Sequence, residues 1–492
     1  MGNGDEERNA LKYASDWSSA ADPLQHPRGW VHVGVWCPRF DAPFAHLRPP
    51  TSRPPAAASM SSFRLRIANA RQIVQVCAHG EPFKAGAAQK DLAVLENASL
   101  VVDQAGKIAS VGPAADVDKW LSAQPQPVTF EKDVDARDLV VLPGFVDAHT
   151  HPVWSGNRVN EFAMKLAGAT YMEVHESGGG INNTVRHTKK SSEAELSALL
   201  RTRLDRMLRC GTTLIEAKSG YGLETDTELK MLRILHAAST GDDAHPVEIV
   251  SNYLGGHSVP DGMTAAAATE DIVSKQIPAL VQAKKDGTIS PEFIDVFCEK
   301  GVFEHDDTRR ILEAGKKAGL DINFHGDEMH PMQSGTMAAD LGARAISHCE
   351  MLTADDLQAM ANHKPEPVFA VLLPTTKFIL KLPNPPARDM IAAGVPVALG
   401  SDYNPNAHCL SMALTMNMAC VQFGMTMTEA LVGATINAAA SINRSATHGS
   451  LEVGKQGDFV LMRATQWEQI IYEMGDPPIE HVVKKGVFYP AL

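Results

Sequence analysis

The feature that most constrains the fold is an alternation of short apolar runs with helical patterns between residues 143 and 450. Eight runs have the length and the β-branched and aromatic content that are typical of buried strands. They are LVVLPGFVDAH (139–149), TTLIEAK (212–218), VEIVSNYL (247–254), FIDVFC (293–298), LDINFH (320–325), RAISHC (344–349), PVFAVLL (367–373) and VPVALGS (395–401). Eight strands alternating with helices predict an α/β fold, a (β/α)8 TIM-like barrel over 143–450. In such barrels the functional residues lie at the carboxyl ends of the strands.

Two of the helical segments begin with recognisable capping signals. A capping box formed by Ser192 and Glu195 predicts a helix over 193–209. A second helix is expected to follow Thr225 as its cap, with Glu228 as the acidic member of the box. Both helices support the alternation on which the barrel prediction depends.

The two ends of the chain outside the barrel are rich in strand and turn patterns. Residues 63–142 contain several short strands, and residues 451–492 contain a few more. Neither segment is long enough to form a full sandwich. We therefore expect the two segments to pair into one small composite β-sandwich domain.

Residues 1–62 differ from the rest in composition. They hold eight of the 30 prolines and show no apolar period, so they are expected to form a disordered N-terminal extension. Acidic and basic side chains are equally frequent there, which argues against a transit peptide. Met60, just before SSFRLRIANA, is an alternative start of the chain.

The overall composition narrows the range of partners. The net charge is -13 and no basic block occurs, which argues against nucleic acid as a partner. No run approaches the roughly 18–20 apolar residues that a membrane span needs, so no membrane partner is expected. The seven cysteines form no CxxC pattern. They are typical of buried thiols in a reducing compartment, which predicts a cytoplasmic location.

Histidines and one aspartate gather at the ends of the predicted strands. His149 and His151 end the first strand, and alternate residues of a strand share a face, so both point the same way. His325 ends the fifth strand, His348 the sixth, and Asp402 the eighth. Three imidazoles with one carboxylate suit Zn²⁺ or Fe²⁺ better than Mg²⁺ or Ca²⁺. The sequence therefore predicts a metal centre at the carboxyl end of the barrel.

Longer motifs around these residues resemble the amidohydrolase superfamily of metal-dependent hydrolases and, within it, the imidazolonepropionase family. The motifs are LPGFVDAHTHPVWSGNR, EAKSGYGL, LGGHSVP, FHGDEMHP, ISHCEML, LLPTT and GSDYNPNA, and the resemblance covers about residues 63–490. It implies hydrolysis of 4-imidazolone-5-propanoate to N-formimidoyl-L-glutamate in histidine degradation, which breaks a cyclic amide C–N bond. It also implies a homodimer with one divalent metal per subunit, Zn²⁺ or Fe²⁺.

The resemblance assigns a role to each strand-end residue. The implied metal ligands are His149, His151, His325 and Asp402. The implied catalytic residues are Asp402, which can accept a proton from water, Glu328, which can hold that water, and His348, which can face the developing oxyanion. A metal with an open position would lower the pKa of the water towards about 7. Which of the three side chains moves the proton stays open.

The resemblance also implies a set of substrate contacts. They are Arg158, Tyr221, His257, Glu328, Asn404, Asn406 and Ala407. A guanidinium fork suits the propionate of the substrate, which supports Arg158. The segment NPNA stands where bacterial relatives typically have a glycine and a hydroxyl residue. Asn406 and Ala407 therefore carry over only as backbone contacts.

Three alternatives stay open at this point. A two-metal site would use a carboxylated lysine after the fourth strand, where Lys300 is the candidate, although the resemblance implies a single metal. A purine or pyrimidine aminohydrolase would share the superfamily layout, but a nucleobase does not need the cation of Arg158. A non-catalytic relative usually loses its metal ligands, whereas this chain keeps all four.

Overall fold

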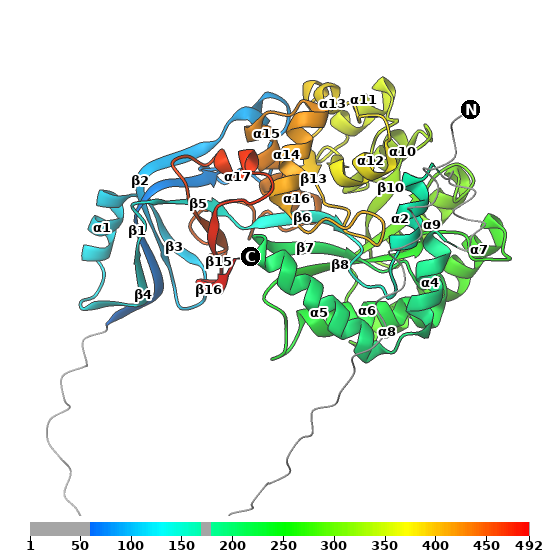
Figure 1. Ribbon diagram of the computed structural model, residues 1–492, viewed down its shortest axis with the longest axis horizontal. Coiled ribbons are helices and arrows are strands. Elements are labelled where there is room, and N and C mark those ends of the chain that lie inside the picture. Colours follow the sequence, from blue (N-terminus) through cyan, green and yellow to red (C-terminus); the bar gives the residue numbers. More distant parts are fainter. Residues whose placement is uncertain (1–59, 169–178, 492) are drawn as a thin grey trace, which may run out of the picture. The chain divides into compact units, whose positions relative to one another are not determined.

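An eight-stranded parallel barrel forms the larger part of the protein, and it confirms the predicted fold class (Figure 1). A computed structural model describes residues 60–168 and 179–491, so the extension predicted over residues 1–62 lies almost entirely outside the described residues. The barrel strands pair in chain order. They are β6 (Phe145–Thr150), β7 (Thr212–Lys218), β8 (Glu248–Gly256), β9 (Phe293–Cys298), β10 (Asp321–Gly326), β11 (Ala345–His348), β12 (Phe369–Leu372) and β13 (Val397–Leu399).

The barrel closes between its first strand and the segment that follows its last one. The backbone N–H of Asp402 donates to the carbonyl of His149 at 3.0 Å, and that of His151 donates to the carbonyl of Tyr403 at 2.9 Å. The segments that carry the predicted metal ligands therefore also hold the barrel closed.

Helices separate the barrel strands as the alternation predicts, and three more helices follow the last strand (Figure 1). They are α2 (Val159–Leu166), α4 (Ile181–Lys190), α5 (Glu193–Arg209), α6 (Thr225–Ser239), α7 (Ala265–Asp271), α8 (Ile277–Lys285), α9 (His305–Lys317), α10 (Ser334–Leu341), α11 (Ala354–Asn362), α12 (Pro374–Leu380), α13 (Ala387–Ala393), α14 (Met412–Phe423), α15 (Met427–Gly433) and α16 (Ile436–Ser441). A π-helical turn at Ile272–Gln276 joins α7 to α8.

The two capping predictions have different outcomes. Helix α5 begins after a capping box in which Ser192 and Glu195 each bond the other's backbone N–H, as expected. For α6 the prediction is wrong, because Thr225 is the first helical residue and Glu224, which precedes it, makes no side-chain cap. Glu228 instead turns to the loop before the helix, which is described with the site below.

A second sheet unites strands from both ends of the described chain. Its order is β16-β15-β14-β5-β1-β2-β3, and β4 pairs with β1. The strands are β1 (Ser61–Val76), β2 (Ala93–Val102), β3 (Ile108–Pro113), β4 (Val128–Asp135), β5 (Leu139–Pro143), β14 (Phe459–Arg463), β15 (Ile479–Lys484) and β16 (Val487–Pro490). The antiparallel pair β5–β14 joins the two ends, and helices α1 (Ala114–Ser122) and α17 (Gln469–Tyr472) and a 3₁₀ turn (Gly86–Lys90) complete this part.

The first predicted strand run divides between the two sheets. Residues up to Pro143 belong to β5, and Phe145 begins β6. Gly144 lies between them, and a Cβ atom at this position would collide with the side chain of Thr213. The change of sheet therefore needs a glycine here.

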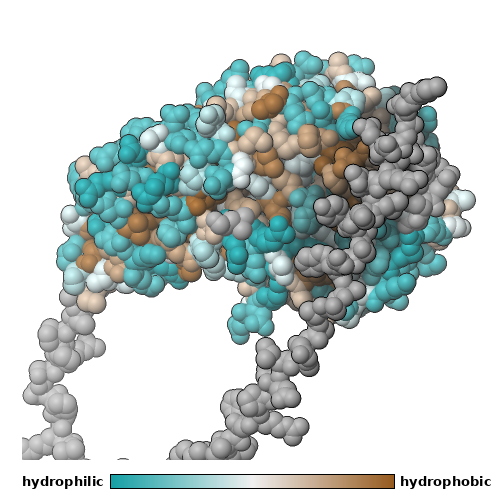
Figure 2. Space-filling model, viewed as in Figure 1, coloured by the Kyte–Doolittle hydropathy of each residue, from teal (hydrophilic) through white to brown (hydrophobic). Residues whose placement is uncertain are grey.

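The apolar side chains of the described chain are mostly buried, and those that are exposed are scattered. Figure 2 shows mostly hydrophilic residues on the face in view, with apolar residues in separate patches. In residues 60–168 and 179–491 we find no helix that combines the length and the apolar character needed to cross a membrane. The six cysteines in this part of the chain are all free thiols.

Candidate active site

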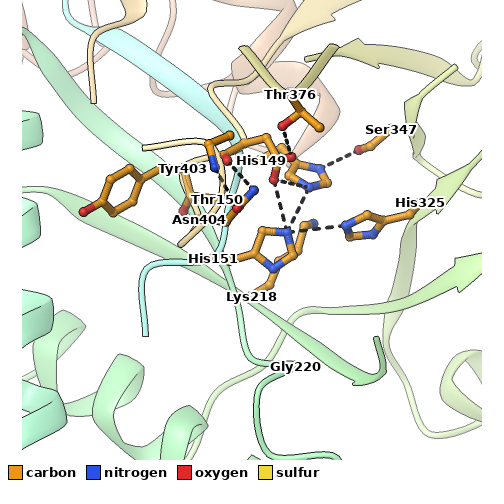
Figure 3. Close-up of polar contacts among 12 residues, drawn as sticks. His149, Thr150, His151, Lys218, Gly220, His325, Ser347, Thr376, Tyr403 and Asn404 are labelled. Carbon is orange, nitrogen blue, oxygen red and sulfur yellow. Dashed lines mark hydrogen bonds and ion pairs between the residues drawn. The ribbon is translucent and has the colours of Figure 1, made fainter. Parts of the chain in front are cut away.

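Four of the predicted side chains converge at the carboxyl end of the barrel, and Figure 3 labels the three histidines among them. His149 is the penultimate residue of β6, His151 follows that strand, His325 lies on β10, and Asp402 follows β13. Each is at most 3% exposed. The barrel thus brings together residues that are up to about 250 positions apart in the sequence.

The distances within this cluster fit a single metal ion. The Nε2 atom of His151 lies 3.3 Å from that of His149 and 3.4 Å from that of His325. Asp402 Oδ1 lies 3.3 Å from His151 Nε2 and 3.5 Å from His149 Nε2. Four ligands at about 2.0–2.1 Å around a tetrahedral ion stand about 3.3 Å apart. These four residues could therefore hold one ion with little movement.

Hydrogen bonds behind the cluster orient its rings. The Nδ1 atom of His325 lies 2.8 Å from a carboxylate oxygen of Asp295, and a carboxylate can only accept, so this ring nitrogen carries the proton. The Nε2 lone pair is then directed at the cluster. His149 Nδ1 lies 2.8 Å from Ser347 Oγ, and the hydroxyl of Thr376 donates to Asp402 Oδ2. Sequence reasoning missed all three partners.

Glu328 and His348 lie beside the cluster as a pair, with Glu328 Oε2 3.6 Å from His348 Nε2. Burial raises the pKa of the Glu328 carboxyl well above its usual value, and the charge of Asp402 acts in the same direction. Burial lowers the pKa of His348 to about 3, with a further contribution from His325. A neutral imidazole beside a readily protonated carboxyl suits proton transfer and the stabilisation of an oxyanion.

Tyr221 and His257 form one wall next to His151. The ring centroid of His151 lies 4.9 Å from that of His257 and 5.9 Å from that of Tyr221. His257 Nδ1 lies 2.9 Å from the carbonyl oxygen of Gly220 and must donate to it. Its Nε2 is therefore a hydrogen-bond acceptor, which suits an N–H group of a bound ring.

The loop that carries Tyr221 is held by Glu228, the residue that the sequence assigned to a capping box. The Glu228 carboxylate accepts backbone N–H groups of Gly220 at 2.9 Å, Gly222 at 2.7 Å and Leu223 at 2.8 Å. A Cβ atom on Gly222 would lie 2.6 Å from the backbone N of Glu228, so this approach requires glycine. Glu228 thereby fixes both Tyr221 and, through the Gly220 carbonyl, His257.

Arg158 precedes helix α2 and is mostly buried. Its Nε donates to Glu161 Oε2 at 2.6 Å, and the two side chains are 12% and 6% exposed. Among the described residues, the terminal Nη groups of Arg158 make no hydrogen bond. Burial raises the pKa of Tyr221, and the charge of Arg158 opposes the rise.

The loop after β13 uses its amide side chains internally. Asn404 Oδ1 accepts the backbone N–H groups of Asn406 at 2.7 Å and Ala407 at 3.0 Å, and its Nδ2 donates to the Asp402 carbonyl at 2.8 Å. Lys165 Nζ donates to Asn406 Oδ1 at 2.7 Å. These contacts fix the loop against Asp402, while the contact of its residues with substrate stays a prediction.

Lys300, the candidate for a bridge between two metals, is exposed in the turn after β9. The ligand cluster is buried, so the structure does not bring Lys300 to it. A different lysine is buried close to the cluster, at the end of β7. Lys218 is 1% exposed and forms ion pairs with Glu216 and Asp295.

The fold and the strand-end cluster define a class of protein, and the comparisons with known proteins agree with it. Residues 140–488 match the amidohydrolase family, and the chain belongs to that family. An adenosine deaminase from Xanthomonas campestris with bound zinc has a TM-score of 0.62 at 19% identity, covering 88% of this chain and 94% of that one. The E. coli guanine deaminase has a TM-score of 0.61 at 16% identity, covering 87% and 99%. These two likenesses show the fold alone.

Curated relatives narrow the position of the chain within this family. A protein from Dictyostelium discoideum named probable imidazolonepropionase is 58% identical over 424 residues, covering 86% of this chain and 97% of that protein. A Mus musculus protein of the same name is 54% identical over 428 residues, covering 87% and 98%. Identity at this level, over nearly the whole of each relative, makes the chain a member of the imidazolonepropionases.

Proposed function

We propose that the protein hydrolyses 4-imidazolone-5-propanoate to N-formimidoyl-L-glutamate, a step of histidine degradation. The observation that carries the proposal is the buried cluster of His149, His151, His325 and Asp402, accompanied by a mostly buried arginine, Arg158, and a histidine acceptor, His257. The cluster suits hydrolysis of an amide bond. The cation and the acceptor suit a ring that bears a carboxylate.

The proposed cofactor is one divalent ion per chain, Zn²⁺ or Fe²⁺, held by His149, His151, His325 and Asp402. Three imidazoles and one carboxylate are donors that both ions accept. When bound, the ion lowers the pKa of the attacking water towards about 7 and polarises the ring carbonyl.

The side chains around the cluster supply the proton chemistry. Asp402 and Glu328 are placed to orient the attacking water and to take up its proton. His348 is placed to donate an N–H to the carbonyl oxygen as negative charge develops there. The ring C–N bond then breaks, the ring nitrogen takes a proton, and the former carbonyl carbon becomes a carboxylate. Which of these three side chains moves the proton stays open.

The substrate is oriented by the surrounding loops. In our proposal the Nη groups of Arg158 bind the propionate as a fork, and His257 Nε2 accepts a ring N–H beside Tyr221. Glu328 also contacts the ring. Backbone groups around Asn404, Asn406 and Ala407 contact the polar end of the product. A nucleobase has no carboxylate to accept from the Nη groups of Arg158, since Glu161 engages only Nε, which argues against a purine or pyrimidine aminohydrolase.

The kind of partner, the cellular location, the oligomeric state and the domain division are also part of the proposal. The net charge of -13 supports a small-molecule substrate rather than nucleic acid. The free thiols of the described chain support a cytoplasmic location. A homodimer and a division into an extension, a composite β domain and a barrel follow from the family resemblance and the strand patterns, and both stay proposals.

The direct test is an assay of formimidoylglutamate formation from imidazolone propanoate, with metal analysis on the same sample. We expect one zinc or iron ion per chain, loss of activity after chelation, and recovery when the metal is returned. Guanine serves as the control substrate and should release no ammonia. Two ions per chain would contradict the single-metal site. A protein that binds the metal tightly but forms no formimidoylglutamate would contradict the proposed substrate.

A separate prediction concerns Glu228. In Glu228→Gln the amide NH₂ replaces an acceptor that binds loop N–H groups, so at least one of the three hydrogen bonds is lost. We expect KM to rise by roughly 5–20-fold, because a hydrogen bond to a charged group contributes about 1.5 kcal/mol or more, while kcat changes less. Glu224→Gln, at the start of the same helix, is the matched control and should leave KM unchanged. Steady-state kinetics that give equal KM values for both variants would show that the loop does not depend on Glu228.

A further inference from the structure

A buried ion-pair network lies directly behind one of the proposed metal ligands. Lys218 Nζ, at the end of β7, lies 2.6 Å from Glu216 Oε1 and 2.8 Å from Asp295 Oδ2. The other oxygen of Asp295 accepts both the ring Nδ1–H of His325, at 2.8 Å, and its backbone N–H, at 3.0 Å. One carboxylate therefore connects the lysine to the histidine. None of the proposed steps of the reaction uses this lysine.

The network is anchored on its other side as well. Glu216 Oε1 also accepts Asn252 Nδ2 at 2.7 Å. Glu216 Oε2 lies 3.3 Å from the backbone N of Thr150, the residue between the first two metal-site histidines. The charged groups thus link five neighbouring strands, β6 to β10, at the level of the cluster, and Lys218 is drawn close to it in Figure 3.

The charges of the network complement those of a divalent ion. Burying three charged groups is costly, and apolar side chains of similar volume would hold the strands together at least as well. Two carboxylates and one ammonium carry a net charge of about -1. Together with Asp402 this gives two negative charges, which balance the charge of one divalent ion. Packing of the strands alone would not require two carboxylates, Glu216 and Asp295, beside a single lysine.

We propose that Lys218 is a positioning residue of the metal centre. By holding Oδ2 of Asp295, it directs Oδ1 to His325 and so fixes that ring with Nε2 towards the ion. The inference rests on the proposed metal centre and extends it to a side chain that touches neither ion nor substrate. Carboxylates that orient a metal-bound imidazole typically change metal affinity by about 10–100-fold when they are lost.

The test compares Zn²⁺ affinities by competition with a chelator. Lys218→Met alone leaves two buried carboxylates without a cation and can fail to fold, so the main variant is the double substitution Glu216→Gln with Lys218→Met. This pair keeps the net charge at about -1. The new glutamine NH₂ can donate to Asn252 Oδ1, which lacks a partner among the described residues. Any loss of Zn²⁺ affinity then reflects position rather than charge.

We expect the double variant to bind Zn²⁺ about 10–100-fold more weakly than the wild type, with a melting temperature of the metal-free protein close to normal. Asp295→Asn should have an effect of similar size. Adding it to the double variant should weaken binding little further, because Lys218 acts through Asp295. Lys284→Met is the control. It removes an exposed lysine on α8 whose Nζ donates to the Pro291 carbonyl at 3.0 Å, and this variant should bind Zn²⁺ normally.

A spectroscopic readout separates positioning from a purely structural role. In the zinc-loaded wild type, the Nδ1–H of His325 should give a strongly hydrogen-bonded ¹⁵N NMR signal that shifts in the double variant. A folded double variant with wild-type Zn²⁺ affinity and an unchanged signal would overturn the inference and leave the proposed metal centre intact. A wild-type protein that fails to bind Zn²⁺ or Fe²⁺ would overturn both.

Discussion

Asp402→Asn is expected to abolish turnover, with kcat reduced by about 10³-fold or more, while the fold stays intact. The asparagine carbonyl can still accept the hydroxyl of Thr376. Its NH₂ group then faces the three imidazoles, and it can neither ligate an ion nor accept a proton. The loss therefore combines a missing metal ligand with a missing base.

The measurement is kcat together with the metal content of the purified variant. Asp340→Asn, which changes an exposed partner of Arg309, is the control and should behave as the wild type. Near-normal activity of the Asp402 variant would contradict the proposed site as a whole, because Asp402 is the one carboxylate of the described chain that groups with these histidines as a candidate ligand.

Arg158→Ala is expected to raise KM by roughly 10–100-fold with a smaller change in kcat. Glu161 ties down Nε, so the Nη groups are directed as a fork that can bind a carboxylate through two charge-assisted hydrogen bonds. Hydrogen bonds to charged groups contribute about 1.5–3 kcal/mol, which corresponds to this range of KM. The change should appear in KM because the propionate does not take part in the bond that breaks.

Steady-state kinetics with two substrates can isolate this contact. A methyl ester of the propionate lacks the charge, so its KM should be similar in the wild type and in Arg158→Ala. Arg233→Ala, which removes an exposed partner of Glu193, controls for the loss of a cation elsewhere. If KM for the acid stays unchanged in the Arg158 variant, the carboxylate is held by another group.

Much of the barrel could be predicted because each strand is a continuous apolar run. The runs at 212–218 and 293–298 match β7 and β9 at both ends. The last strand, Val397–Leu399, is shorter than the run at 395–401 at both ends. After it the chain leaves the sheet at Gly400, and Asp402 adopts a φ of 47°. That departure depends on contacts with β6, which no local pattern reveals.

The cluster of candidate ligands was predictable for a similar reason, because polar residues at strand ends are visible in a sequence that is otherwise apolar there. Glu228 was assigned to a helix cap because its spacing from Thr225 fits a capping box. Three loop N–H groups bind its carboxylate instead, and that competition depends on tertiary packing. Lys218 and Asp295 are visible in the sequence as charged residues inside apolar strands. That the two side chains pair, however, follows only from the order of the strands.

The pairing of β5 with β14 affects how the chain can fold during synthesis. The partner of β5 is made about 320 residues later. At roughly 5–20 residues per second, the ribosome takes about 15–60 s to reach it. During that time the edge of β5 that pairs with β14 has no partner. An unpaired strand edge can pair with another chain and so promote aggregation. The sheet that contains β5 is thus begun before the barrel in translation. It is completed only after the whole barrel has been synthesised.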